Sequence, residues 1–567
     1  MAQHNKRNPA KRPIGKAVPP RINNQGKEIK LSLYESLNNW LNRKEKGITI
    51  LAFSLCTLFS LLLFQARMDI GGDDSGYILR AYDFIHKGAF PSYQGPLYPL
   101  VLSIFISLFG IRIVLLKVVS LLFNFFALYF LFKTFRKRLP ALVFFPVLIL
   151  TSINAYILSF ASLTYSEACF MFLQALVFYF FFKLIDKLNQ APAGSIKDTY
   201  PYFLYSALFV FLLSLSRSVG LFALPGLLLY FIVRRQFRSA AYFTGAFALF
   251  YILFGFIKKF IFHVSAEWGA ERSALMLKDQ YNPSKGVETM SGFGERFIGN
   301  ANLYLSKRFF QVIGLRSPDA IDINKALTYF FVGLSVFALY RAIKSKNNYI
   351  LASALYCGVM LCCTFLAVQT QIDQPRLVMV YVPFLLFIFI YAIYDALKKA
   401  PWAGQSMLVY LIVISFIASG ASLINRTAAN MPVINHNLHG DMSYGFTPDW
   451  ANYIKMSEWC ADNLPANSMV AARKAEISFM YTDKEIFFPV FRAYSTDPDS
   501  VLAYLNKNHV NYVLLASLRI NPNVADGNII NTLWRMMGPV EQKYPQKLKL
   551  VHQEGTAEPA FLYMIVP

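Results

Sequence analysis

The chain has 567 residues, of which 56% are hydrophobic and only 15% are charged. This composition excludes an ordinary soluble globular protein and indicates a chain that crosses a membrane several times. The net charge of +23 would suggest a nucleic-acid partner in a soluble protein. Here most basic residues lie in short segments between apolar runs, where they set membrane topology, so we expect membrane lipids as partners and no nucleic acid.

The N-terminal residues 1–46 are polar and basic, which predicts a cytoplasmic tail whose end lies on the membrane surface near Leu31–Leu41. The first apolar run, residues 48–66, is long for the core of a signal peptide and ends in a poor cleavage site. We therefore predict that this run remains as the first membrane span.

An acidic pair, Asp73 and Asp74, follows the first span directly after two glycines. Adjacent carboxylates at a membrane face are costly, because like charges repel and the interface desolvates them. The glycines before the pair and the proline-bounded loop Gly95–Pro99 after it predict a fixed surface rather than a solvated tail. We expect the pair to be functional; the alternative is a helix N-terminus that is capped by Asp74.

Ten more apolar runs predict the remaining membrane spans, which gives about eleven spans by the ~20-residue criterion. They fall near residues 112–132, 141–160, 167–185, 202–217, 219–233, 240–262, 327–343, 349–370, 377–396 and 405–424. The run Leu97–Phe109 is too short to be counted as a span.

Basic clusters fall on one side of the predicted spans, and that side is expected to be the cytoplasm. The other side then receives the loops 67–111 and 263–326 and the C-terminal residues 430–567. We predict a multi-pass protein of the cell (inner) membrane, with a transmembrane domain over residues 47–425. The basic clusters are Arg43/Lys44/Lys46, Lys133/Arg136/Lys137/Arg138, Lys183/Lys187/Lys197, Arg234/Arg235/Arg238, Arg341/Lys344/Lys346 and Lys398/Lys399.

The C-terminal residues 430–567 differ in character, because turn residues and charges separate short apolar runs at strand spacing. Helical patterns at Pro448–Asn463 and Pro498–Asn508 lie between these runs. Strands that alternate with helices predict a small, soluble α/β domain outside the cytoplasm. The expected strands are Met469–Ala472, Ile486–Val490, Tyr512–Ala516, Leu548–His552 and Phe561–Val566.

The stretch from Asp69 to Gly110 resembles the first external loop of the GT-C type glycosyltransferases that use polyprenyl-phosphate-linked sugars. These include the protein O-mannosyltransferases and the aminoarabinose transferases of lipid A. In that loop an Asp-Asp or Asp-Glu pair precedes a Tyr by three residues, and a helix and a proline-rich turn lead to Leu-Phe-Gly; here Tyr77 takes the Tyr position. The resemblance implies a GT-C-like fold in which Asp73 is the catalytic base and Asp74 is its partner, and it implies that Leu97–Phe109 is a juxtamembrane helix.

Glu167 lies at the outer start of a predicted span, where GT-C members often show Ser-Glu or another acidic residue. Together with Asp74, this carboxylate is expected to hold a divalent cation, Mg²⁺ or Mn²⁺, through oxygen ligands. The alternative is an exposed acid that is favoured at a helix N-terminus by the helix dipole.

Arg217 is flanked by two short apolar runs, and an Arg at membrane depth requires an anion. Many members of these families have a similar Arg-x-x-Gly turn, here Arg217 to Gly220, and we expect the lipid phosphate to bind there; the alternative is a buried structural ion pair. Arg376 is a second candidate, although Leu377 stands where the family pattern has Tyr. Its alternative role is a local pair with Asp373.

Lys307 and Arg308, in the loop 263–326, are expected to approach the same phosphate along a helix over 293–312 at the membrane interface. The alternative is a solvated charged face.

Nucleotide sugars are cytoplasmic, so an active site on the opposite face must take its sugar from a carrier that crosses the membrane. We expect a sugar to pass, with inversion, from a polyprenyl phosphate to a lipid, glycan or protein acceptor outside the cytoplasm. The alternatives are a transporter or flippase of lipid-linked sugars, and a polysaccharide polymerase or ligase without the Asp-Asp pair. The six cysteines form no disulfide framework or CxxC site, and the chain has no GxxxxGK[ST], HExxH or GxGxxG motif.

Overall fold

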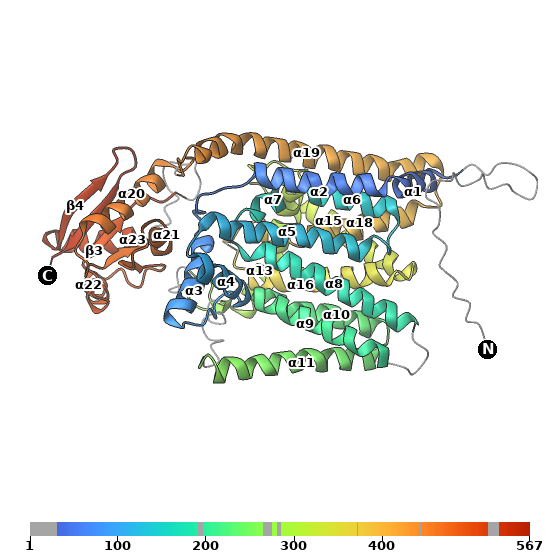
Figure 1. Ribbon diagram of the computed structural model, residues 1–567, viewed down its shortest axis with the longest axis horizontal. Coiled ribbons are helices and arrows are strands. Elements are labelled where there is room, and N and C mark those ends of the chain that lie inside the picture. The colour runs from blue at the N-terminus through green and yellow to red at the C-terminus, as the bar shows by residue number, and fades with distance from the viewer. Residues whose placement is uncertain are drawn as a thin grey trace, which may run out of the picture.

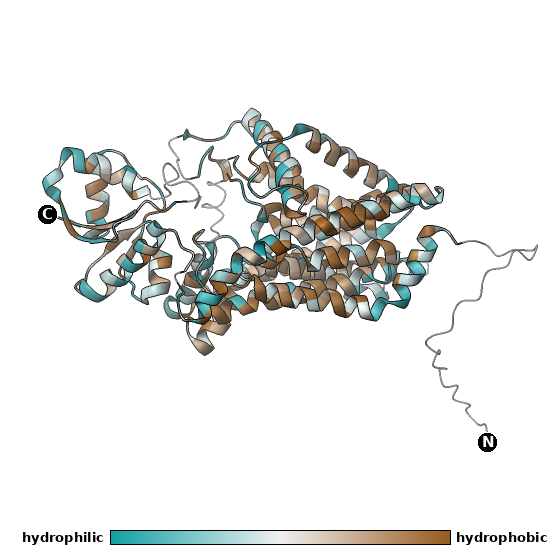
Figure 2. Cartoon of the chain, turned by 90° about the horizontal axis from the view of Figure 1, so that it is seen from above, coloured by the Kyte–Doolittle hydropathy of each residue, from teal (hydrophilic) through white to brown (hydrophobic). Residues whose placement is uncertain are grey.

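The computed structural model describes residues 31–190, 197–264, 275–280, 285–370, 372–442, 444–519 and 532–566. Helices form a bundle along the long axis of the molecule, and a mixed α/β region, the C-terminal region (residues 444–566), lies at one end of it (Figure 1). The helices of the bundle are predominantly apolar, whereas polar residues are frequent in the C-terminal region (Figure 2). This division agrees with the predicted membrane domain and small α/β domain.

Among the residues that the structure describes, seven helices are long and apolar enough to cross a membrane. A bent pair of shorter helices, α6 and α7, adds an eighth if it counts as one span, with a bend of 50°. Asn154 fixes this bend, because its side chain caps α7 and also donates to the carbonyl of Val312. The helices concerned are α2 (Glu45–Leu62), α5 (Ile113–Phe135), α6 (Ala141–Ser152), α7 (Ala155–Ala161), α8 (Ser166–Gln190), α11 (Phe237–Phe260), α15 (Lys325–Lys344), α16 (Asn348–Ala367) and α19 (Trp402–Leu438).

Each of the eleven predicted apolar runs is helical, but three of them form helices too short to meet the length criterion by themselves. The predicted count of about eleven is therefore higher than the seven or eight spans that length and composition support. One cause is the break at Arg217, which is extended (φ −155°), and at Gly220, which packs tightly against the carbonyl of Leu213. The shorter apolar elements are α4 (Leu97–Phe109), α9 (Tyr200–Ser216), η2 (Ser218–Phe222), α10 (Ala223–Val233) and α18 (Val382–Leu397).

Helix α1 (Leu33–Arg43) lies at the end of the bundle opposite the C-terminal region (Figure 1). A capping box between Ser32 and Glu35 starts this helix, and the backbone N–H of Tyr34 donates to Gln405 at 3.0 Å. The predicted surface-lying segment near Leu31–Leu41 is therefore an ordered helix that is fastened to α19, and residues 1–30 of the tail lie outside the described residues.

Short elements connect the spans. They are α3 (Asp73–Lys87), η1 (Lys197–Thr199), α13 (Met290–Leu303), η4 (Tyr304–Arg308, a π-helical turn), α14 (Phe309–Val312) and α17 (Arg376–Met379). The helix predicted over 293–312 is present as α13, η4 and α14, but much of it is buried against neighbouring helices. At the end of the bundle next to the C-terminal region, α3 and α4 lie side by side (Figure 1).

The C-terminal region is a five-stranded sheet with the strand order β2-β1-β3-β5-β4. Strand β1 pairs in parallel with β2 and β3, and β5 pairs antiparallel with β3 and β4. Every strand and both helices predicted for this region are present. The elements are α20 (Pro448–Asn463), β1 (Val470–Ala472), α21 (Ala475–Thr482), β2 (Phe487–Pro489), α22 (Pro498–Lys507), β3 (Tyr512–Leu515), α23 (Thr532–Lys543), η5 (Pro545–Lys547), β4 (Leu548–Glu554) and β5 (Ala560–Ile565).

Helix α21 packs against α3 and so attaches the C-terminal region to the bundle. The rings of Phe479 and Tyr82 lie 5.1 Å apart, and Glu485 forms an ion pair with Lys87 at 3.2 Å. Phe479 and Met480 belong to the apolar core of the bundle rather than to the two cores on the faces of the sheet. The first loop is thus held between the spans and the C-terminal region.

Candidate active site

The acidic pair stands at the start of α3, where the chain leaves a glycine turn. Gly72 is the N-cap residue and has a φ of +84°, a conformation that favours glycine. No side chain caps this helix, so the alternative reading of Asp74 as a capping residue is wrong. Because successive helical residues point about 100° apart, the two carboxylates face different surroundings.

Asp74 faces the protein interior and is completely buried. Its carboxylate lies 3.2 Å from the ammonium of Lys117 and accepts hydrogen bonds from the backbone N–H groups of Asp69 and Thr164. Lys117 also donates to the carbonyl of Arg67 at 2.5 Å. Burial raises the pKa of Asp74, and Lys117 offsets part of this rise. Asp74 is thus a buried anchor, because its contacts connect the 67–72 segment to α5 and to the start of α8.

Asp73 faces the other way and forms an ion pair with Arg376 at 2.5 Å. Burial of Asp73 favours its neutral form, but Arg376, Lys474 and Arg80 outweigh burial and hold the pKa of this carboxyl below its usual value. The side chain of Asp73 is 27% exposed. Asp73 is therefore an ionised carboxylate with access to solvent, whereas Asp74 is enclosed.

Glu167 joins the two arginines that the sequence identified. Arg217 donates to its Oε1, and a guanidinium nitrogen of Arg376 lies 3.6 Å from the same oxygen. Glu167 is only 1% exposed, so the alternative reading of an exposed helix acid is wrong. Its Oε2 is buried and has no hydrogen-bond partner among the residues that the structure describes. Asp73, Glu167, Arg217 and Arg376 thus form one cluster.

Three members of this cluster, Asp73, Arg217 and Arg376, line a pocket of ≈ 200 Å³, which we name the arginine pocket. Its polar side consists of Asp73, Tyr77, Gln94, Arg217, Ser218 and Arg376. Its other walls are mainly apolar and come from α8, η2, α16 and the α17–α18 segment; they comprise Phe170, Val219, Thr364, Ala367, Val368, Leu377, Val380 and Tyr381. The pocket therefore places two guanidinium groups and one carboxylate beside a surface that suits hydrocarbon.

Lys307 and Arg308 are not among the residues that line the arginine pocket. Both bind the carboxylate of Asp373, Lys307 at 2.8 Å. Asp373 therefore pairs with these two residues, and Arg376 pairs with Asp73, so the alternative local pair of Asp373 with Arg376 is wrong. The alternative of a solvated face is also wrong, since Lys307 and Arg308 are largely buried. Their approach to a lipid phosphate stays a prediction.

The contacts of Asp74 and Glu167 do not fit a divalent ion between them. Asp74 is held by backbone N–H groups and Lys117, whereas Glu167 is held by Arg217 and Arg376. Mg²⁺ and Mn²⁺ require several oxygen ligands that are not committed to cations. Across the described ranges, no group of three or more His, Cys, Asp and Glu side chains gathers to hold a metal. A metal cofactor therefore stays a prediction of the sequence.

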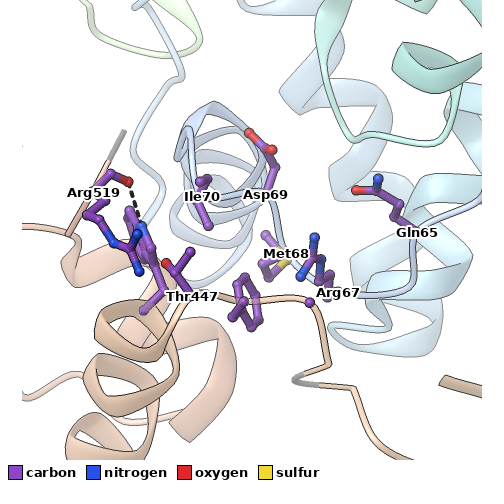
Figure 3. Close-up of a pocket in the computed structure, with 10 residues that line it drawn as sticks. Gln65, Arg67, Met68, Asp69, Ile70, Thr447 and Arg519 are labelled. Carbon is purple, nitrogen blue, oxygen red and sulfur yellow. Dashed lines mark hydrogen bonds between the residues drawn. The ribbon is translucent and has the colours of Figure 1, made fainter. Parts of the chain in front are cut away.

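A second pocket, of ≈ 230 Å³, lies between the 67–72 segment and the C-terminal region. Figure 3 shows Arg67, Met68 and Ile70 beside Thr447 and Arg519, while the carboxylate of Asp69 points away from Thr447. The guanidinium of Arg67 stacks on the Phe446 ring at 4.6 Å. We name this the junction pocket. Asp69 lines this pocket and Asp73 lines the arginine pocket, so the first loop contributes to both.

Three further residues of the site were missed in the sequence. Lys117 had a visible signal, since it is a charge in the interior of the apolar run 112–132, whose other charge, Arg112, stands at its start. Tyr165, whose hydroxyl donates to Asp69, and Lys474, whose ammonium donates to the carbonyl of Gly71 at 2.7 Å, had none, because neither stands in a distinctive local pattern.

No family model and no curated protein matches this sequence. Solved structures do match. ArnT from Cupriavidus metallidurans, bound to undecaprenyl phosphate, has a TM-score of 0.52 at 11% identity over 92% of this chain and 98% of that one. The oligosaccharyltransferase of Archaeoglobus fulgidus, in complex with Zn and sulfate, has a TM-score of 0.53 at 13% identity over 82% and 68% of the two chains. The archaeal AglB from the same organism, in complex with an inhibitory peptide and a dolichol-phosphate, has a TM-score of 0.52 at 12% identity over 91% of this chain and 74% of that one.

At these identities the likeness establishes the fold. The chain therefore has the GT-C fold of membrane glycosyltransferases.

Proposed function

We propose that this chain is a glycosyltransferase that moves a sugar from a polyprenyl-phosphate-linked donor to an acceptor, with inversion at the anomeric carbon. The observation that carries this proposal is the arginine pocket, in which Asp73 meets Arg217 and Arg376 beside apolar walls. ArnT binds undecaprenyl phosphate and AglB binds a dolichol-phosphate, and both share this fold, which supports the same donor class here.

In the proposed complex, the donor phosphate lies against the guanidinium groups of Arg217 and Arg376. Arginine favours phosphate because its planar donors bind two oxygens at once. Arg217 and Arg376 already bind carboxylates, which neutralise part of their positive charge. Arg80 and Lys474 bring further positive charge toward Asp73 and so compensate for this loss. The first isoprene units would follow the apolar walls toward the lipid.

The chemistry requires a base and a stabilised leaving group. Asp73 takes the proton of an acceptor hydroxyl, the acceptor oxygen attacks the anomeric carbon, and the bond from that carbon to the phosphate oxygen breaks. The products are a glycosylated acceptor and polyprenyl phosphate, whose new charge is neutralised by the two arginines. A donor phosphate that competes for Arg376 also weakens the ion pair of Asp73, which makes this carboxylate more basic when it is needed.

The site is expected to lie outside the cytoplasm, in a cell (inner) membrane. Helix α3, which carries Asp73, lies at the end of the bundle next to the C-terminal region (Figure 1), and the basic clusters of the sequence support an extracytoplasmic position for that end. The acceptor would then be an extracytoplasmic lipid, glycan or protein, and it would approach along the same end.

The proposal is tested with purified protein in lipid nanodiscs, a panel of polyprenyl-phospho-sugars with a radiolabelled sugar, and an envelope extract as the acceptor. Transfer of label to the extract, with release of polyprenyl phosphate, is the expected result. Transfer from no donor, together with movement of intact lipid-linked sugar across proteoliposome membranes, would favour a flippase. Growth of a glycan chain on the lipid carrier itself would favour a polymerase or ligase.

A further inference from the structure

Lys474 extends from the C-terminal region to the start of α3. It follows β1 and precedes α21, and its ammonium donates to the carbonyl of Gly71 at 2.7 Å. The side chain is buried, with 7% relative exposure. A β-carbon on Gly72 would lie 2.6 Å from the same ammonium, so Lys474 packs directly on the turn that precedes Asp73. The geometry thus joins the C-terminal region to the catalytic carboxylate through one side chain.

Lys474 follows the end of β1, and this position explains why the sheet can bind another segment at the edge where β1 ends. From β1 the chain passes through α21 to β2 on one side, and from β2 through α22 to β3 on the other side. The ends of β1 and β3 therefore flank a topological switch point, where open α/β sheets bind ligands. Here that edge meets the chain's own 67–72 segment, because Lys474 contacts Gly71 and Arg519 lines the junction pocket.

The charges around Lys474 favour an influence on Asp73. Its ammonium interacts with the carboxylates of Asp69 and Asp73 from the loop and α3, and with Arg473 and Glu476 from its own segment. The backbone N–H of Lys474 donates to the hydroxyl of Tyr453 in α20, which fixes the backbone behind the side chain. Burial and then Arg473 lower the pKa of Lys474 to about 8, so the side chain is still largely charged at neutral pH.

We propose that Lys474 is a positioning residue for glycosyl transfer. Its ammonium holds the Gly71–Gly72 turn, which aims Asp73 into the arginine pocket, and its positive charge keeps Asp73 ionised and ready to accept a proton. This inference rests on the proposed function. Other contacts also dock the C-terminal region, namely the Tyr82–Phe479 ring contact and the Lys87–Glu485 ion pair, so loss of Lys474 leaves the docking in place.

The test compares Lys474→Met, Lys474→Gln and Lys507→Met in single-turnover transfer over a range of pH. Lys507 is an exposed lysine of the same region and serves as the matched control. Lys474→Met should lower kcat by about 10- to 100-fold, the effect of a misplaced reacting group, and should leave the donor KM within about twofold. The acidic limb of its pH profile should move to higher pH, because Asp73 loses a neighbouring cation. Lys474→Gln keeps a donor for Gly71 and should recover part of kcat but not the position of the limb.

Two results would overturn the inference. One is a kcat and a pH profile of Lys474→Met that equal those of Lys507→Met. The other is a loss of activity in Lys474→Met that comes with a lower unfolding temperature and an unmoved acidic limb, which would make Lys474 merely structural. Wild-type protein that transfers sugar from no donor would instead refute the proposed function, and this inference with it.

Discussion

Arg376 binds Asp73 at 2.5 Å, and the same guanidinium lies 3.6 Å from Glu167, which in turn holds Arg217. The two arginines are thus aligned side by side by carboxylates before any donor arrives. Such pre-alignment reduces the side-chain entropy that is lost when the donor binds. It also means that an incoming phosphate competes with carboxylates for the same donors.

Arg217 should govern donor affinity. Lys at this position keeps a charge for Glu167 but loses the two-pronged geometry, so Arg217→Lys should raise the donor KM, and Arg217→Ala should raise it further, by roughly 10- to 100-fold. Arg341, which is 18% exposed against 19% for Arg217 and pairs with the buried Asp395, is a matched control. An Arg217→Ala variant with normal yield and the donor KM of Arg341→Ala would show that Arg217 is structural.

Lys117 and Asp74 should act on stability. Lys117→Met leaves a buried carboxylate without its ammonium, and loss of one partner from a buried pair costs about 3–5 kcal/mol. The double variant Lys117→Met/Asp74→Asn should recover much of this loss, since neither charge remains. The unfolding midpoints of the wild type, Lys117→Met and the double variant are measured by thermal unfolding in detergent. Identical unfolding midpoints for the wild type and Lys117→Met would contradict the role of Asp74 as a buried anchor.

The pH dependence of stability and of turnover should reveal the titration of Lys474. Its pKa falls from 10.5 to about 8 on folding, so between these values the unfolded chain binds more protons than the folded one. The contribution of Lys474 to the free energy of unfolding therefore increases as the pH rises through this range. Activity should move in the opposite direction, because the neutral amine binds the carbonyl of Gly71 more weakly than the ammonium does and so positions Asp73 less firmly. A decline in kcat above about pH 8 that is absent in Lys474→Met, without a fall in unfolding temperature, is the expected result. The same alkaline decline in wild type and Lys474→Met would contradict it.

The orientation of the chain is tested by cysteine labelling. A membrane-impermeant maleimide applied to intact cells should label Lys507→Cys, in the last turn of α22, and should spare Lys344→Cys, in the last turn of α15. Both positions are exposed in the structure. The opposite pattern would place the arginine pocket on the cytoplasmic side and would remove the reason for a lipid-linked donor.

The sequence predicted that four side chains of the site emerge at the same end of the apolar runs, but it grouped Glu167 with Asp74 rather than with the two arginines. Asp73, Glu167, Arg217 and Arg376 follow or precede apolar runs in the alternation that brings all four to one end, and the structure joins them by direct contacts. The short strands of the C-terminal region could also be predicted from the sequence, since turn residues flank each apolar run.

The partners of individual side chains were less predictable. Asp73 and Asp74 are neighbours in sequence, but helical geometry turns one to the pocket and the other to Lys117. Asp373 stands three residues before Arg376, a spacing that makes side chains neighbours when both residues belong to one helix. Helix α17 begins at Arg376 itself, so Asp373 lies outside it and pairs with residues from another segment.

The most direct test of the account is single-turnover transfer by Asp73→Asn beside Asp83→Asn. Both aspartates stand on α3, both are 27% exposed, and each pairs with one cation, so the two substitutions differ chiefly in whether the side chain faces the arginine pocket. Asparagine is nearly isosteric with aspartate but cannot take the acceptor proton. The account predicts that Asp73→Asn folds, binds undecaprenyl phosphate and loses about 10²- to 10⁴-fold in kcat, while Asp83→Asn retains wild-type turnover. Full activity of Asp73→Asn, or an equal loss in both variants, would contradict the assignment of Asp73 as the base.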